Sequence, residues 1–128
     1  MPTFLGPEDL VAAARAVLRG QPPLLRDAGA LVAAAGQPAA TWDGVALYPT
    51  VDDQAAALLV SVVSNHPFVD GNTRVGWVGA RLFYALNGHE LRVPEDAAVA
   101  LVLAVADGSV RDVPLVAGAL SRYRRALA

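Results

Sequence analysis

The sequence predicts an all-α domain: a compact bundle of about six short helices, interrupted by one short extended segment. Hydrophobic residues make up 55% of the 128 residues and charged residues only 17%, a balance that excludes an intrinsically disordered chain. Ala is abundant and aromatic residues are few, which favours helix over strand. Pro and Gly recur at intervals that mark helix starts and ends. We expect residues 1–128 to form a single domain.

The sequence of residues 7–48 predicts two helices and a hairpin. A helix is expected over residues 7–18, because it opens with Pro and two acids and Gly20 follows it. A second helix is expected over residues 27–35 and ends at Gly36. The stretch Thr41–Tyr48 then looks extended around an Asp-Gly pair, which predicts a short hairpin or ordered flap.

Four more helices are expected after Thr50, whose side chain caps the third. Residues 55–63 are apolar on nearly every face, so the third helix should be central and buried. The last three helices are expected over residues 72–86, 94–107 and from 112 to about Arg125. We further expect His89 to be a surface histidine in a turn, Trp77 to face the core or a neighbouring helix, and the last helix to end in a solvated basic turn of Arg122, Arg124 and Arg125.

The charge balance excludes several classes of partner and site. The net charge is −2 and the sequence pI is about 5.5, so the basic footprint of a nucleic-acid-binding protein is absent. All ten basic residues are Arg and there is no Cys, which excludes catalytic lysines, disulfides and thiolate zinc sites. The longest apolar stretches are too short to span a bilayer, and the N-terminus lacks a signal peptide. We therefore expect a soluble, cytoplasmic protein that binds neither nucleic acid nor membrane.

The stretch Asn65–Arg74 contains the candidate catalytic and binding residues. It lies between two helices that are predicted to be buried, where a tight loop is expected. Pro67 forces the chain out of helical geometry directly after His66. Gly71 allows close approach of the backbone, and the unpaired N–H groups of the next helix make an anion site. Arg74, in the first turn of that helix, can add a fork of donors to a phosphate.

His66 and Asp70 complete a set of groups suited to phosphoryl transfer. A single carboxylate beside a phosphate site is typical of Mg²⁺, which also takes phosphate oxygens and waters as ligands. An imidazole can take a proton from a hydroxyl. Each residue alone has a structural interpretation, such as a helix-end His, an N-cap Asp or a surface Arg. Together they fit the transfer of a nucleotide's phosphate group to an alcohol.

Residues 66–74 resemble the signature His-Pro-Phe-x-Asp/Glu-Gly-Asn-x-Arg of the Fic/Doc superfamily. The flanks are similar to its death-on-curing (Doc) branch: Arg26-Asp27 before an Ala/Leu helix, Leu47-Tyr48-Pro49-Thr50, and Asn87-Gly88. The resemblance extends from about Pro7 to Leu103 and implies the compact helical Fic fold. It also implies a toxin of a type II toxin–antitoxin system that uses ATP or another nucleoside triphosphate with Mg²⁺.

The resemblance assigns roles to the residues of the motif. His66 would be the base on the target hydroxyl, and Asp70 would hold Mg²⁺. Nucleotide phosphates would be bound by Gly71, Asn72, Thr73 and Arg74, while Pro67 and Phe68 would anchor the loop. The flap that aligns the target segment would contain Trp42, Asp43, Gly44 and Tyr48.

Two positions depart from the family pattern. Thr73 stands where Doc toxins usually carry Lys and adenylylating members usually carry Gly, and Trp77 stands where adenylylating members carry a second Arg. The missing second Arg favours the Doc type, whose members are kinases that phosphorylate translation elongation factor Tu. Adenylylation of a target and a catalytically weak binding protein, the latter because of Thr73, remain the alternatives. The chain lacks the self-inhibitory Ser/Thr-x-x-x-Glu-Gly/Asn pattern, so the resemblance implies a cognate antitoxin that acts in trans.

Overall fold

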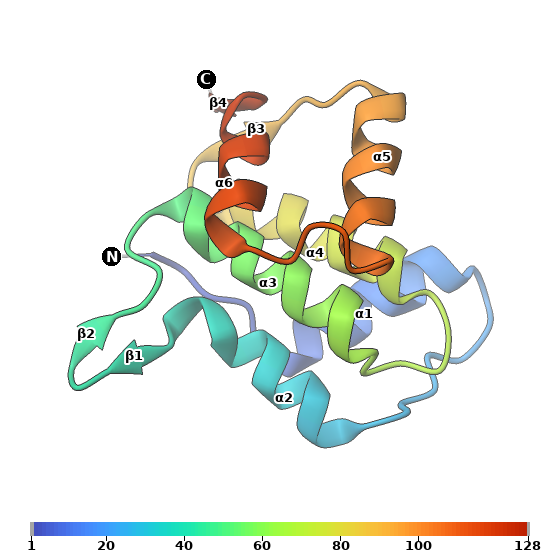
Figure 1. Cartoon of the computed structure of the whole chain (residues 1–128). Helices are drawn as coiled ribbons and strands as arrows, with labels where there is room; N and C mark the ends of the chain where they lie inside the picture. Colours follow the sequence, from blue (N-terminus) through green and yellow to red (C-terminus); the bar gives the residue numbers. More distant parts are fainter. Residues whose placement is uncertain (1, 128) are drawn as a thin grey trace.

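The computed structural model describes residues 2–127 and confirms the all-α fold. The helices in that range are α1 (Pro7–Leu18), α2 (Ala28–Gly36), α3 (Val51–Asn65), α4 (Asn72–Leu86), α5 (Glu95–Ala106) and α6 (Val113–Ser121), with a 3₁₀ turn at Gln37–Ala39. Two small antiparallel sheets accompany them: β1 (Thr41–Trp42) with β2 (Val45–Ala46), and β3 (His89–Leu91) with β4 (Arg124–Ala126). Figure 1 shows α3 in the middle of the molecule, with the other helices around it.

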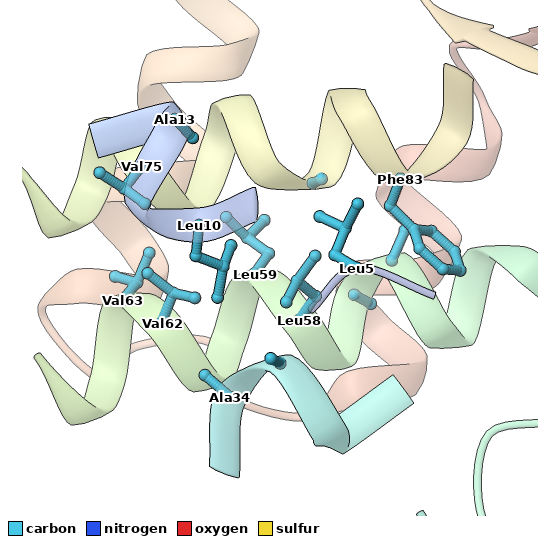
Figure 2. Packing of buried hydrophobic residues seen from close by; sticks show 14 of the residues in the cluster. Leu5, Leu10, Ala13, Ala34, Leu58, Leu59, Val62, Val63, Val75 and Phe83 are labelled. Carbon is cyan, nitrogen blue, oxygen red and sulfur yellow. The ribbon is translucent and has the colours of Figure 1, made fainter. Parts of the chain in front are cut away.

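Helix α3 is the central helix, as its apolar sequence predicts. The Thr50 hydroxyl caps it by accepting a hydrogen bond from the Asp53 N–H at 3.0 Å. Its residues 55–59 are at most 1% exposed. In Figure 2, Leu58 and Leu59 of α3 meet buried side chains of α1 and α4. One long buried helix therefore holds the other helices in place and carries the loop at its C-terminal end.

A glycine lets α3 and α4 approach closely. A Cβ atom at Gly76 would lie 2.8 Å from Cγ2 of Val63 and 3.3 Å from Cδ1 of Leu59. The first contact is too short for two carbon atoms and the second is tight, so the two helices pack at this separation because there is no side chain at this position. The packing fixes the relative positions of the helix before and the helix after the Asn65–Arg74 stretch.

The predicted hairpin is present between α2 and α3. Its turn residues Asp43 and Gly44 have φ angles of 51° and 78°, the left-handed pair that a type I′ hairpin turn requires. Thr41 pairs with Ala46 across the hairpin. Two residues after β2, the Tyr48 carbonyl accepts a hydrogen bond from the Gln54 side-chain amide at 3.0 Å, which connects the hairpin to the first turn of α3.

The structure corrects three expectations for the second half of the chain. The last helix ends at Ser121 rather than near Arg125, and Arg124–Ala126 forms β4, which pairs with His89–Leu91. Arg122 and Arg125 are exposed as expected, but Arg124 is only partly exposed and its guanidinium binds the Asp52 carboxylate at 2.8 Å. His89 is likewise half-buried in β3 and lies edge-on to the Tyr84 ring. Backbone pairing between β3 and β4 and this ion pair outweigh the helix propensity of the tail.

A search of residues 2–127 for a membrane-spanning helix finds none of sufficient length and hydropathy.

Candidate active site

The loop between α3 and α4 starts with a left-handed histidine. His66 ends α3 with φ 49° and ψ 62°, and its N–H donates to the Val62 carbonyl at 3.2 Å. A non-glycine residue in this conformation costs about 1–2 kcal/mol, so it persists only where the surroundings hold it. Pro67 and Phe68 then turn inward and are buried, Phe68 being 1% exposed. The loop is thus fixed in the core on one side, while His66 stays exposed on the other.

Asn72 braces the loop from inside. Its side-chain oxygen accepts the Phe68 N–H at 3.0 Å, and its side-chain amide donates to the Phe68 carbonyl at 2.8 Å. Asn72 is only 8% exposed, so both bonds satisfy backbone groups that lie away from water. The Asn72 side chain is therefore committed to shaping the loop.

The start of α4 presents backbone N–H groups beside Asp70 and Arg74. Gly71 precedes the helix with φ 82°, and a Cβ there would lie 3.2 Å from Cδ2 of Leu18. Its N–H donates to the Asp70 carboxylate at 2.8 Å. The N–H groups of residues 72–74 have no acceptor within the helix, which makes this end attractive to anions. The exposed Arg74 guanidinium donates to the Val17 carbonyl at 3.3 Å, at the same end of α4.

The two titratable side chains of the motif are accessible. His66 and Asp70 are both exposed, and the His66 imidazole has no hydrogen-bond partner among the side chains of residues 2–127. In the described range no group of three or more His, Cys, Asp or Glu residues could hold a metal by itself. One free carboxylate oxygen on Asp70 fits a Mg²⁺ ion whose other ligands are phosphate oxygens and water, and does not fit a fully protein-built metal site.

The motif residues line two different hollows. His66 and Asn72 line an open hollow of about 560 Å³, together with Arg26. Thr73 and Arg74 line a mostly apolar groove of about 400 Å³ between the end of α1, the start of α4 and α5. Trp77 also lines this groove and packs against the core, as its sequence position predicts.

The hairpin expected to act as the flap is not beside the motif. The hairpin precedes the first residue of α3, whereas His66 follows its last residue, and a 15-residue helix is about 22 Å long. Figure 1 shows the β1–β2 hairpin and the α3–α4 loop at opposite ends of α3. The structure therefore does not bring Trp42, Asp43, Gly44 and Tyr48 together with His66 and Asp70.

A different extended segment, Leu24–Asp27, lies along the motif loop. Leu25 forms an antiparallel bridge with Phe68, and the Val69 N–H donates to the Leu24 carbonyl at 2.9 Å. Arg26 donates to the loop through both its backbone and its side chain. This segment was missed because it has no strand pattern, although a Pro after His66 signals that the end of α3 needs outside donors.

Comparisons with known proteins agree with the geometry. The family model described as "Fic/DOC family" matches residues 4–84, which include the whole loop from His66 to Arg74. The chain is also 42% identical over 96 residues to a protein of Mycolicibacterium smegmatis named "Toxin Doc"; the alignment covers 75% of this chain and 73% of that protein. With a matching model over most of its length and a relative this similar, the chain belongs to the Fic/DOC family.

Proposed function

We propose that this chain is a Doc-type toxin that transfers a phosphate group from a nucleoside triphosphate, such as ATP, to a hydroxyl of a target protein. One observation carries the proposal: a single braced loop carries an accessible imidazole, a free carboxylate oxygen and an open helix N-terminus with an arginine. The similarity to a protein named "Toxin Doc" supports the same class.

Each group has a distinct part in the proposed reaction. His66 takes the proton from the target hydroxyl, whose oxygen forms a bond to the γ-phosphorus while the bond to the β-phosphate oxygen breaks. The N–H groups at the start of α4 and Arg74 hold the phosphates and stabilise the charge that develops on them. Asp70 would hold Mg²⁺, which neutralises phosphate charge when it is bound. The products are the phosphorylated target and the nucleoside diphosphate.

Adenylylation is the second candidate activity. In that reaction the hydroxyl oxygen attacks the α-phosphorus and AMP passes to the target. The half-buried Trp77 packs against the core at the position where adenylylating relatives carry a second Arg, so a second guanidinium is missing there. This difference favours transfer of the γ-phosphate.

The third candidate is a binding protein with weak catalysis, and a substitution at Thr73 distinguishes it from the two transferases. The Thr73 side chain lies on the first turn of α4 and lines the apolar groove beside Arg74. If the protein is degenerate, Thr73→Lys should create a transfer activity that the parent lacks, because a cation returns beside the phosphates. An unchanged rate in Thr73→Lys would mark threonine as a functional variant of the motif.

The proposed partners follow from the family resemblance and from the groove. The target is elongation factor Tu, which would place the reaction in the cytoplasm. The antitoxin, supplied in trans, occupies the apolar groove beside Thr73 and Trp77. Arg74 lies at this groove and so does Glu95. A bound segment with apolar residues along one face, and with both an acidic and a basic side chain, would therefore match it.

The deciding experiment uses ATP labelled in parallel at the α- and γ-phosphates. Each label is incubated with the purified protein, Mg²⁺ and a bacterial lysate or elongation factor Tu, with His66→Ala as the control. Transfer to a protein band from the γ-label alone supports the kinase. Transfer from the α-label supports the adenylyltransferase. If neither label exceeds the His66→Ala background, the transferase proposal fails and the binding protein becomes the leading candidate.

A further inference from the structure

The backbone on both sides of His66 needs donors that α3 cannot supply. The last carbonyls of any helix lack partners within it. Many helices that end in a left-handed residue close with a hydrogen bond from the N–H of the next residue. Here the next residue is Pro67, which has no N–H. The His66 N–H already donates to the Val62 carbonyl, so neither residue offers a donor to the carbonyls of Asn65 and His66, which need one from another segment or from water.

Arg26 supplies those donors from the connection between α1 and α2. Its Nε donates to the His66 carbonyl at 2.5 Å, and its Nη2 donates to the Asn65 carbonyl at 2.6 Å. Its backbone N–H donates to the Pro67 carbonyl at 2.8 Å. One residue thus binds three consecutive carbonyls at the end of α3. Its positive charge also lies at the negative end of the helix dipole.

These bonds define the backbone conformation of His66. The Asn65 carbonyl belongs to the peptide plane before the His66 Cα, and the His66 carbonyl belongs to the plane after it. The orientations of those two planes relative to the Cα are its φ and ψ angles. Because the planar guanidinium fork binds one carbonyl of each plane, it holds His66 in the left-handed conformation. That conformation sets the direction in which the imidazole leaves the backbone.

We propose that Arg26 is a positioning residue for His66, an inference that rests on the proposed transferase function. Its guanidinium donates to two backbone carbonyls of the loop, so its part in the proposal is to orient His66 rather than to hold the nucleotide phosphates. The phosphate-binding end, formed by Gly71, Arg74 and the start of α4, is braced separately by Asn72. Loss of Arg26 should therefore lower kcat and leave the KM for ATP nearly unchanged.

The test compares Arg26→Ala, Arg26→Gln and Arg26→Lys with the parent, and uses the exposed Arg15 of α1 for the matched control Arg15→Ala. In γ-label transfer, we expect kcat of Arg26→Ala to fall roughly 10- to 100-fold, since displacement of a catalytic group by about 1 Å has effects of this size. The KM for ATP should stay within about twofold. The kcat values of Arg26→Lys and Arg26→Gln should lie between those of the parent and Arg26→Ala, because each new side chain replaces part of the fork. Millimolar methylguanidine should partly restore the kcat of Arg26→Ala. Arg15→Ala should match the parent.

A parental kcat in Arg26→Ala would overturn the proposal. A raised KM for ATP at unchanged kcat would also overturn it, because Arg26 would then be a nucleotide ligand. A readout independent of activity is the three-bond coupling between the amide and α protons of His66, which reports φ. We expect this coupling to change in Arg26→Gln while core amides keep their hydrogen-exchange rates. If the parent transfers no label, the proposed function fails, and an unchanged coupling would separately refute the role of Arg26.

Discussion

The two ends of α3 differ in which of their groups are satisfied. At the N-terminal end the side chains are paired: Thr50 caps the helix, and Asp52 accepts hydrogen bonds from Tyr84 at 2.7 Å and Arg124 at 2.8 Å. At the C-terminal end it is the backbone that is paired, through Arg26 and Asn72, while the imidazole of His66 is left accessible. One helix therefore carries a structural cluster at one end and the candidate active site at the other.

The difference gives a criterion for telling such clusters apart. Polar side chains that satisfy one another stabilise a fold and have no capacity left for a ligand. A loop whose backbone is bonded by its neighbours, and whose charged side chains remain free, is rigid and still reactive. Mutations at the two ends should consequently separate stability from activity.

The largest effect is expected for His66→Ala. Loss of a general base lowers the rate of label transfer by about 10²- to 10⁴-fold, while the exposed position should leave the free energy of unfolding within about 1 kcal/mol of the parent. His66→Asn, a residue that tolerates the left-handed conformation, should lose the same activity with an even smaller change in stability. Transfer rates and urea unfolding measure the two effects. A His66→Asn variant with parental rates would exclude the imidazole as the base.

Asn72→Ala should lower both the stability of the fold and the rate of label transfer. Removing the side chain leaves the N–H and carbonyl of Phe68 without partners in a buried position, and each such group costs about 1–3 kcal/mol. We expect the free energy of unfolding to fall by about 2–4 kcal/mol in urea titrations, with loss of label transfer because the loop is no longer braced. Asn72→Asp keeps the acceptor and loses the donor, so it should lie between. Equal stability of parent and Asn72→Ala would mean that water replaces the amide.

Asp52→Ala is the counterpart at the other end of α3. It removes the shared partner of Tyr84 and Arg124 and should lower the free energy of unfolding by about 1–2 kcal/mol, since Arg124 is partly exposed. The neighbouring Asp53→Ala is the matched control, because it removes a first-turn acid without breaking these bonds. Label transfer by both variants should equal that of the parent below their unfolding temperatures. A selective loss of transfer in Asp52→Ala would show that the two ends are coupled.

Most of the fold was predictable because it depends on local signals. These signals are the helix caps, the Gly and Pro positions and the apolar run of α3, and each acts over a few residues. The structure confirms the helices that they predict. The pairing of Arg124–Ala126 with His89–Leu91 was missed because it joins segments about 35 residues apart through backbone groups that any sequence carries. Non-local strand pairing leaves little trace in composition or periodicity.

The candidate site was predictable in its residues and less so in its surroundings. The contiguous stretch from His66 to Arg74 places its own members together, so their grouping follows from the chain itself. The neighbour of the loop, Leu24–Asp27, comes from a segment some 40 residues earlier, and the expected hairpin lies at the opposite end of α3. Which segment covers a loop depends on helix packing, which the motif does not encode.

The smallest effect concerns pH and the cluster at the N-terminal end of α3. Burial, followed by the hydrogen bond to Asp52, raises the pKa of the Tyr84 hydroxyl well above its ordinary value near 10. Above pH 10 the unfolded chain loses this proton while the folded protein keeps it, so stability falls as pH rises and is fully present below pH 10. We expect Tyr84 to contribute a loss of about 1 kcal/mol between pH 10 and pH 11 in urea titrations. Tyr84→Phe should lack this contribution, and equal slopes for parent and variant would mean that Tyr84 ionises in the folded protein as readily as in the unfolded chain.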